Sequence, residues 1–176
     1  MPSIVLIGFM GTGKTAVGRV LAERLGQEFI DLDAVIEEQE GISIAEIFRR
    51  HGEAHFRKLE QKAVAEVSQR RDVVLAAGGG AVLDRENVVN LKRMGPVVHL
   101  MAHPEMIVRR IAGQHHRPLM EVEDRRGRIE NLLAVRLPFY AVADMDIDTS
   151  GLSVKKVVER IIGRLKESDT GEIDHG

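Results

Sequence analysis

Short apolar runs alternate with longer amphipathic stretches along most of this chain. Each run is about five residues long and rich in Val, Ile and Leu, which is typical of strands buried on both faces of a parallel sheet. We expect such strands at 3–7, 28–33, 73–77, 97–101 and 145–149. Between them, apolar residues recur at the spacing of helices that bury one face. We expect these helices at 14–25, 53–70, 85–93, 105–111, 126–141 and 154–165, with two short ones from about 34 and 44.

The alternation of strands and helices predicts an α/β fold. Repeated βαβ units give one parallel sheet with helices on both faces, a three-layer arrangement. Ser43 and Glu46 have the spacing of a capping box and open the helix at 44, which Gly52 ends. We expect a single domain over 1–166, followed by a polar, disordered tail at 167–176.

The stretch from Gly8 to Thr15 fits the pattern of a phosphate-binding loop: Gly, four free positions, Gly, Lys, and Ser or Thr. It stands between an expected strand and an expected helix, where its glycines let backbone N–H groups turn inward to an anion. Lys14 can reach the β and γ phosphates of a nucleotide, and the Thr15 hydroxyl can bind a bridging Mg²⁺. A turn that merely joins strand to helix would not need these two side chains. We therefore expect nucleotide contacts from Gly11, Thr12, Gly13, Lys14, Thr15 and Ala16.

Two carboxylates close the second expected strand. If the extended backbone persists, Asp31 and Asp33 point to the same side, at the sheet edge where ligands of open α/β folds bind. A plainer role is also open, because either residue could cap the helix that begins near Ala34. Capping would still leave Asp33 at the mouth of the site.

A possible ion pair and a run of glycines come next along the chain. Arg57 and Glu60 lie one helical turn apart and could pair, although the spacing alone favours an ordinary surface ion pair. Gly78, Gly79 and Gly80 follow the third expected strand. They would permit positive φ and let a bound molecule touch the backbone.

The segment 112–126 has no steady periodicity and carries many charges, which predicts a mobile flap, or lid. Pro118 would stiffen the backbone that presents the Arg117 guanidinium. His115 and His116 belong to a residue type that binds metals, but nothing nearby in the sequence completes a metal site. We therefore expect no metal site at the two histidines.

Three further residues concern the cleft and the core. Arg136 and Tyr140 lie one turn apart in the helix expected at 126–141, so a cation directed at the cleft would be steadied by a neighbouring ring. His99 lies within the fourth expected strand, where we expect it to be packed and hydrogen-bonded rather than catalytic.

Composition limits the class of protein. With 176 residues, 44% of them hydrophobic, the chain suits one compact domain. Its 25 basic and 27 acidic residues give a net charge of −2, so no overall field favours nucleic acid or an anionic membrane. Aromatic residues are only 3%, which argues against a stacking platform for single-stranded nucleic acid. The chain has no cysteine, and we expect neither a leader nor a membrane-spanning run, and hence a soluble, cytoplasmic protein.

The candidate residues together suit phosphoryl transfer, in which a protein mainly aligns the reactants and stabilises charge. Taken in order, they resemble the shikimate kinase family, and the likeness extends from Ile4 to about Thr149. The phosphate loop alone is common to many enzymes, whereas the whole set is specific. It comprises Gly8 to Thr15, Asp31-Leu32-Asp33, Ser43-Ile44 with Ile47-Phe48, Gly52-Glu53 with Phe56-Arg57 and Glu60, Gly78-Gly79-Gly80, Arg117-Pro118-Leu119, and Arg136 with Tyr140.

The resemblance implies a small monomeric P-loop fold like that of nucleoside monophosphate kinases, with a five-stranded parallel sheet and a lid at about 112–126. It implies that ATP phosphorylates the 3-hydroxyl of shikimate, a step toward chorismate and the aromatic amino acids. Shikimate would bind at a segment of about 32–61, and one Mg²⁺ per subunit would take part.

The resemblance also assigns roles to single residues. Asp33 would hold the substrate hydroxyls and accept a proton, while Lys14 and Arg117 would act on the transferring phosphate. Arg57 and Arg136 would grip the shikimate carboxylate. The remaining roles are shikimate contacts at Gly79 and Gly80, orientation of Arg57 by Glu60, Mg²⁺ binding at Thr15 and Asp31, and an adenine contact at Arg110. One departure is the loop 149–153, which lacks the Arg and Pro of some relatives, so we expect it only to wall the adenine pocket.

Three alternatives remain open from the sequence. Gluconate kinase would share the loop and the lid, and gluconate also carries a carboxylate. A GTP-binding switch is disfavoured, because the switch-like stretch 124–127 follows no strand and the chain has no Asn-Lys-x-Asp sequence for guanine. A catalytically silent binder would not need Lys14, Thr15 and Asp33 intact.

Overall fold

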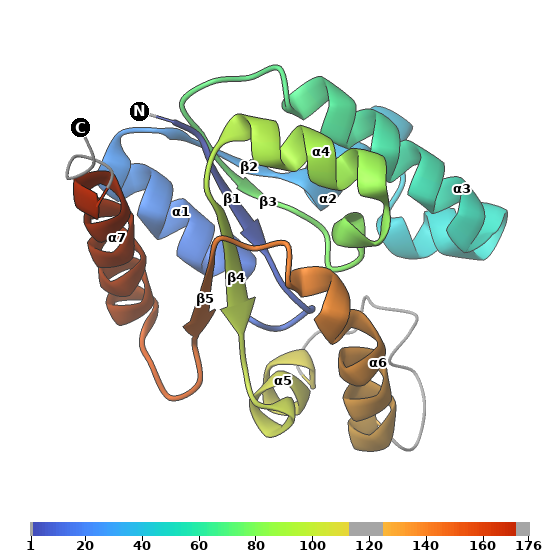
Figure 1. Ribbon diagram of the computed structural model, residues 1–176. Helices are drawn as coiled ribbons and strands as arrows, with labels where there is room; N and C mark the ends of the chain where they lie inside the picture. The colour runs from blue at the N-terminus through green and yellow to red at the C-terminus, as the bar shows by residue number, and fades with distance from the viewer. Residues whose placement is uncertain (1, 113–124, 172–176) are drawn as a thin grey trace.

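The computed structural model describes residues 2–112 and 125–171 and has three layers, a central sheet with helices against both faces (Figure 1). The strands lie in the order β2-β3-β1-β4-β5, and every pair of neighbours is parallel. The expected α/β architecture is therefore confirmed. The strands are β1 (Ile4–Ile7), β2 (Glu28–Asp31), β3 (Val73–Ala76), β4 (Val97–Met101) and β5 (Met145–Asp148). The helices are α1 (Lys14–Leu25), α2 (Leu32–Glu40), α3 (Ile44–Val67), α4 (Arg85–Met94), α5 (Pro104–Ile111), α6 (Arg125–Tyr140), α7 (Val154–Gly171) and the short 3₁₀ helix η1 (Ala81–Leu83).

β1 is the central strand of the sheet. Its Val5 pairs with Leu75 of β3, and its Leu6 pairs with Val98 of β4. All four residues of β1 are buried, because helices cover both faces of a parallel sheet. Since parallel strands end at the same edge, the loops after β1, β2 and β3 meet there.

Alternate residues of the strands supply two separate cores. On one face, Leu6 and Val98 pack with Leu21 of α1 and Val158 of α7. These two helices lie side by side (Figure 1). The period-2 alternation of strand side chains divides the apolar residues of each strand between the two faces.

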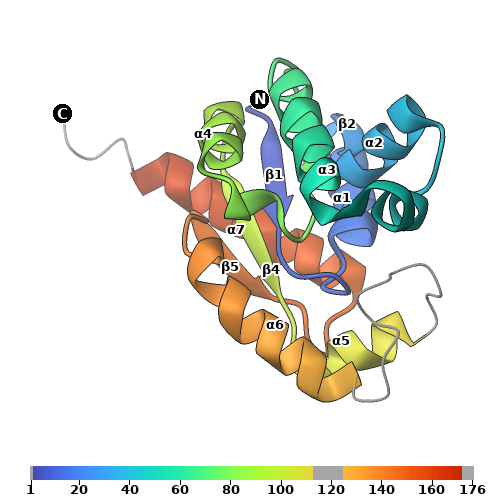
Figure 2. The same cartoon turned by 90° about the vertical axis from the view of Figure 1, so that its right-hand side faces the viewer.

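The opposite face is covered by α3 and α4. Val5 and Leu75 pack there with Val64 of α3 and Leu91 of α4. α2 lies against α3, whereas α5 and α6 pack together beyond the end of β4 (Figure 2). This second core therefore continues from the sheet into the helices that flank its carboxyl edge.

The second expected strand ends earlier than its sequence suggested. β2 stops at Asp31 and α2 begins at Leu32, so Asp33 lies in the first turn of a helix. Asp31 is the N-cap, and its Oδ1 accepts hydrogen bonds from the backbone N–H groups of Asp33 at 3.0 Å and Ala34 at 3.4 Å. The backbone therefore does not stay extended through Asp33, and the plainer role that the sequence left open, a carboxylate that caps this helix, is confirmed for Asp31.

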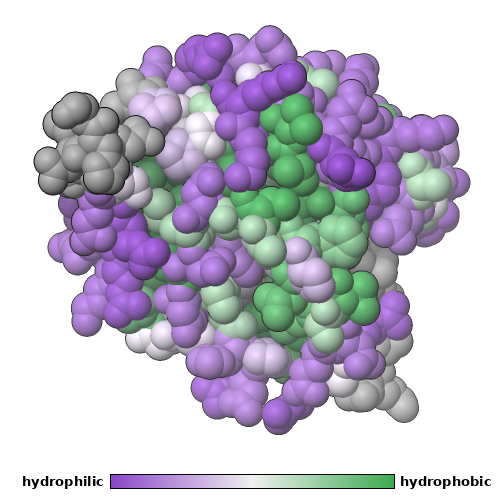
Figure 3. All heavy atoms as spheres, in the orientation of Figure 1, coloured by the Kyte–Doolittle hydropathy of each residue, from purple (hydrophilic) through white to green (hydrophobic). Residues whose placement is uncertain are grey.

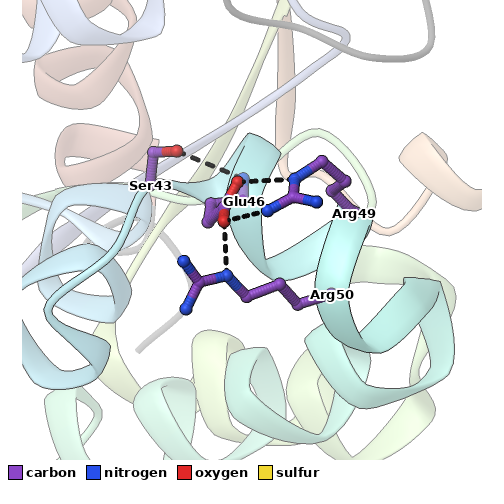
Figure 4. Close-up of polar contacts among 4 residues, drawn as sticks. All are labelled: Ser43, Glu46, Arg49 and Arg50. Carbon is purple, nitrogen blue, oxygen red and sulfur yellow. Dashed lines mark hydrogen bonds and ion pairs between the residues drawn. The ribbon is translucent and has the colours of Figure 1, made fainter.

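The two helices expected around Gly52 are joined as α3, with a kink at Gly52, where φ is 79° and ψ is 175°. Ser43 is the N-cap, and its Oγ accepts a hydrogen bond from the Glu46 N–H at 3.1 Å. The Glu46 carboxylate turns to Arg49, with Nε at 2.8 Å, and to Arg50 (Figure 4). The Arg49 contact and then that of Arg50 lower the pKa of Glu46 to about 2. Only the first half of the expected capping box is thus formed.

α7 extends beyond its expected end at 165 and reaches Gly171. Lys166 and Glu167 have high helix propensity, and adding one more residue to an existing helix costs little. Ser168 also donates a hydrogen bond from Oγ to the Arg164 carbonyl at 3.0 Å. The tail expected from 167 therefore begins as helix, and its last five residues lie outside the described part. Most of the expected lid, residues 113–124, also lies outside it.

Polar side chains cover most of the face in Figure 3, and apolar ones gather over α4 and the end of α6. These helices carry the partly exposed Val89, Val135 and Phe139. Among the helices of the described residues, none combines the length and the apolar character needed to cross a membrane.

Candidate active site

A cleft of about 600 Å³ opens at the carboxyl ends of β1, β2 and β3. Three other expected residues, Arg57, Gly80 and Arg136, lie next to it, around the glycine run after β3. The structure therefore brings the expected nucleotide and substrate residues of the described part to one edge of the sheet. The cleft is lined by Gly11, Thr12, Gly13, Lys14, Thr15, Ala16, Asp31, Asp33, Gly78, Gly79 and Arg110, among others.

The loop after β1 curls around a hollow that suits an anion. Gly11 and Gly13 have φ values of 75° and 96°, which an L side chain would adopt only with strain. Lys14 begins α1, and its Nζ donates to the carbonyls of Gly8 at 2.7 Å and Phe9 at 2.9 Å. The ammonium group is thus fixed across the loop, at a helix N-terminus that favours negative charge.

Thr15 and Asp31 lie in direct contact at the far side of this loop. The Thr15 hydroxyl donates to Asp31 Oδ2 at 2.9 Å, while Asp31 Oδ1 caps α2. Both residues offer oxygen, the donor that Mg²⁺ prefers. Within residues 2–112 and 125–171, no group of three or more His, Cys, Asp or Glu side chains could hold a metal ion. A cation beside Thr15 would therefore depend on phosphate oxygens and water for most of its ligands.

Arg57 and Glu60 form the ion pair that their spacing suggested, with Arg57 Nη1 2.7 Å from Glu60 Oε1. The preference for a surface ion pair was wrong, because the Glu60 side chain is only 1% exposed. Burial raises the pKa of Glu60, and the neighbouring Asp33 raises it further, against the opposing effect of Arg57. Burial alone would lower the pKa of Arg57, but Glu60 and then Glu53 outweigh it and raise that pKa. Arg57 is therefore charged, and its ion pair with Glu60 holds the guanidinium in place.

The glycine run after β3 lets other side chains approach the backbone closely. A Cβ on Gly80 would lie 2.5 Å from Arg57 Nη2, and one on Gly78 would lie 2.8 Å from Glu60 Oε2 and 3.2 Å from Asp33 Oδ1. The glycines at 78–80 would permit a positive φ, but none of the three adopts one. What requires glycine here is space, because the acidic and basic groups press against the chain.

Arg136 comes to the same place from α6. Although charged, it is only 6% exposed, and its Cζ lies 5.5 Å from the ring centroid of Phe9. Its expected neighbour Tyr140 does interact with it: burial raises the pKa of Tyr140, and the charge of Arg136 opposes that rise. The Tyr140 hydroxyl, however, donates to the Gly79 carbonyl at 2.7 Å. The ring beneath the guanidinium is thus that of Phe9. Phe9 occupies a free position of the loop pattern, so the pattern gave no sign of this contact.

Arg110 joins the phosphate loop to the loop after β5. Its Nη1 donates to the Gly11 carbonyl at 3.0 Å, and its Nη2 donates to the Thr149 carbonyl at 3.3 Å. The buried Thr149 hydroxyl lies within donating distance of two carbonyls, that of Met101 at 2.9 Å and that of Thr12 at 3.1 Å. Sequence reasoning missed this role of Thr149, although a hydroxyl at the end of a strand near the site was a usable signal. Leu152 of the same loop lines the cleft, as expected of a wall.

His99 is packed in the core as expected. It is 5% exposed, its Nδ1 lies 2.8 Å from Asp146 Oδ1, and its ring stacks on Tyr140 with centroids 4.6 Å apart. Burial lowers the pKa of His99, and the Asp146 carboxylate opposes that shift. Arg117, His115 and His116 lie outside the described residues.

A parallel sheet of order 2-3-1-4-5, with a phosphate loop between β1 and α1, defines a P-loop kinase fold. The family model described as shikimate kinase matches residues 10–166. The chain therefore belongs to the shikimate kinase family.

Individual relatives agree with this assignment over nearly the whole chain. The chain is 51% identical over 165 residues to a shikimate kinase of Geobacter metallireducens, covering 93% of this chain and 92% of the relative. It is 48% identical over 162 residues to one of Caldanaerobacter subterraneus subsp. tengcongensis, covering 92% and 95%. A solved shikimate kinase from Acinetobacter baumannii in complex with shikimate has a TM-score of 0.92 and 38% identity, covering 96% of this chain and 94% of that one.

Proposed function

We propose that this protein transfers the γ-phosphate of ATP to the 3-hydroxyl of shikimate, giving shikimate 3-phosphate and ADP. The main observation in support is the position of Arg136 beside the phosphate loop. A Cβ on Gly79 would lie 3.5 Å from Arg136 Nη1 and also 3.5 Å from the Gly8 carbonyl and the Met10 N–H. An anionic acceptor held by this arginine would lie next to the phosphates that the loop is built to cradle.

The acceptor site would be formed by Arg57 and Arg136, with the backbone of Gly79 and Gly80 between them. Two guanidinium groups suit a planar carboxylate, which each can bind through two N–H groups. Glu60 would keep Arg57 in position through their 2.7 Å contact. Shikimate carries one carboxylate and three hydroxyls, so its carboxylate would be the anchor and its hydroxyls would face the loop.

Asp33 would orient the 3-hydroxyl and accept its proton as the oxygen attacks phosphorus. It lines the cleft from the first turn of α2, near the phosphate loop. Lys14 would stabilise charge on the β and γ phosphates. Arg117 of the expected lid would add a further positive charge, and a closed lid would exclude water and limit wasteful hydrolysis of ATP.

Thr15 and Asp31 would hold one Mg²⁺ per subunit, Thr15 directly and Asp31 through water. The cation would neutralise phosphate charge and help align the transferring group. The 2.9 Å contact between the two side chains places two suitable oxygens at the edge of the loop. The backbone from Gly11 to Ala16 would bind the phosphates, and Arg110 with the loop 149–153 would flank adenine.

We also propose a domain organisation, an oligomeric state and a location for the protein. One domain would cover 1–166, with the shikimate-binding segment at about 32–61, a lid at about 112–126 and a tail that begins as helix. The protein would act as a cytoplasmic monomer on shikimate and ATP, without nucleic acid or membrane. Sedimentation at several concentrations would test the monomer.

A coupled assay of ADP release tests the proposed activity. We expect ADP to form rapidly with ATP, Mg²⁺ and shikimate, and slowly when shikimate is left out or replaced by gluconate. Product analysis should show phosphate on the 3-hydroxyl. Equal rates with gluconate, or no acceleration by shikimate, would contradict the proposal.

A further inference from the structure

Tyr140 is the single tyrosine of the sequence, and the roles proposed above do not use it. Its side chain is 2% exposed, and its hydroxyl donates to the Gly79 carbonyl at 2.7 Å. The contact joins α6 to the loop after β3 across 61 residues of sequence. A phenol that reaches over such a separation to one backbone atom fixes that atom relative to α6.

Each carbonyl of the glycine run accepts a hydrogen bond, but from different sources. The Gly78 carbonyl accepts from the Ala81 N–H, and the Gly80 carbonyl accepts from the Leu83 N–H, both at 3.1 Å within the local turn of η1. The Gly79 carbonyl accepts from Tyr140, on a distant helix. Local folding therefore orients the two outer carbonyls, whereas the middle one depends on Tyr140.

The orientation of this carbonyl also sets the orientation of the next amide. The chain has no cis peptide in its described part, so the Gly79–Gly80 unit is planar and trans. Its N–H therefore points to the side opposite its carbonyl. Glycines have no side chain to restrict the dihedral angles on either side of such a unit, so the backbone alone fixes its orientation less firmly than it would between other residues.

Tyr140 is itself held firmly. Its ring stacks on His99 with centroids 4.6 Å apart and an interplanar angle of 22°, and His99 binds Asp146 of β5 at 2.8 Å. Burial raises the pKa of Tyr140 to about 12, against the effect of Arg136, so the hydroxyl stays a donor throughout the neutral range. Asp146 of β5, His99 and Tyr140 thus form a chain of contacts that holds the Tyr140 hydroxyl in place beside the glycine run.

We propose that Tyr140 is a positioning residue for the acceptor: it fixes the Gly79–Gly80 peptide so that the Gly80 N–H is already directed at bound shikimate. This inference rests on the proposed function, because it assumes that shikimate binds beside the glycine run. Without the phenol, the Gly79 carbonyl would be left unpaired or would turn to another donor, and shikimate binding would have to restore the peptide.

The Tyr140→Phe variant tests this inference, because it keeps the ring and its stacking and removes only the hydroxyl. We expect the KM for shikimate to rise about tenfold while the KM for ATP stays unchanged, as a lost buried hydrogen bond on the acceptor side alone would produce. Phe139→Leu is the matched control, since Phe139 is the neighbouring ring on α6 and is 42% exposed. It should leave both KM values as in the wild type. Unchanged KM for shikimate in Tyr140→Phe, or an equal rise in both KM values, would overturn the inference.

A second measurement uses the wild-type protein and does not depend on the variant folding. Because the chain has one Tyr and no Trp, fluorescence excited at a wavelength that phenylalanine does not absorb reports on Tyr140 alone. Because the contact of Tyr140 with Gly79 is formed before the acceptor arrives, shikimate added without nucleotide should leave this signal nearly unchanged, and a large change along the binding curve would show that shikimate, rather than Tyr140, sets the peptide. If the wild type fails to phosphorylate shikimate, the proposed function itself fails. If the wild type is active and the Tyr140→Phe variant has the same KM for shikimate, only the inference about Tyr140 fails.

Discussion

The guanidinium of Arg136 lies over the ring of Phe9, with Cζ 5.5 Å from the ring centroid. Phe9 is part of the phosphate loop, and its carbonyl accepts hydrogen bonds from Lys14 Nζ at 2.9 Å and from the Thr12 hydroxyl at 2.8 Å. One buried residue therefore contacts both the lysine proposed for the nucleotide and the arginine proposed for the acceptor. This contact sets the spacing between the two halves of the site.

Replacing Arg136 with Lys should weaken acceptor binding. The ammonium group cannot form the two-pronged contact with a carboxylate, and it would lie less favourably on the Phe9 ring. We expect the KM for shikimate to rise about tenfold or more, with the KM for ATP nearly unchanged, in steady-state assays that vary each substrate in turn. A rise confined to the KM for ATP would show that Arg136 does not serve the acceptor.

Replacing Lys14 with Ala should abolish turnover and leave the fold intact. Its Nζ bonds the carbonyls of Gly8 and Phe9 in its own loop, and the side chain is only partly buried, so stability should change little. The loss of charge at the phosphates should lower kcat by about a hundredfold or more. Lys62→Ala is the control, because Lys62 lies on α3 with its side chain 69% exposed. A Lys14→Ala enzyme of near-normal rate would remove Lys14 from the chemistry.

Local signals in the sequence predicted the elements well. The bounds of α1 were predicted at both ends, because glycines stand on either side of it and its apolar residues recur at helical spacing. β4 was also predicted at its observed bounds, since Val97–Met101 is an isolated apolar run after Gly-Pro. The start of α2 was missed because Leu32 continues the apolar pattern of the strand before it. There the Asp31 cap decided the structure.

Contacts between distant elements were much harder to predict. The spacing of Arg57 and Glu60 showed that they could pair, but only the packing of α3 against the glycine run makes Glu60 a buried partner. Phe9 occupies a free position of the loop pattern, and nothing local indicates that α6 will place a guanidinium over it. Residue types near the site were therefore predictable, whereas their partners depended on the packing of whole helices.

Adding a methyl group at Gly80 should disturb Arg57 without unfolding the protein. The new Cβ would lie 2.5 to 2.7 Å from three guanidinium atoms of Arg57, which end a flexible side chain and can move. Gly80 has a φ of −110°, outside the left-handed region that disfavours alanine. We expect Gly80→Ala to keep its thermal midpoint within a few degrees and to raise the KM for shikimate about five- to tenfold. Loss of the folded state, or a wild-type KM, would contradict this account.

Acid should destabilise the protein through His99. Burial lowers the pKa of His99 from its ordinary value of 6.5, with an added contribution from Lys14, so folding favours the neutral ring. The corresponding stability is complete above pH 6.5 and is lost as the pH falls from there through the lowered folded-state pKa, at about 1 kcal/mol per pH unit. Thermal midpoints measured from about pH 5 to pH 8 should show this decline in the wild type and a flatter profile in His99→Gln. An equal decline of the thermal midpoint with pH in the two proteins would show that His99 does not cause the loss of stability in acid.

Two helical glycines should respond in opposite directions to the same substitution. Gly163 lies in α7, and in the described part of the chain an added Cβ would meet no atom within 4 Å. Gly163→Ala should therefore gain about 1 kcal/mol from helix propensity and leave turnover unchanged. Gly18 lies in α1, where the Cβ would be 2.4 Å from Phe29 Cε2 and 3.0 Å from Cδ2. The free-energy cost of this crowding should exceed the gain from helix propensity. We therefore expect Gly18→Ala to lower the free energy of unfolding by about 1–3 kcal/mol in denaturant titrations. If both variants were stabilised, Phe29 would have room to move aside, and the packing of α1 on β2 would be looser than the structure shows.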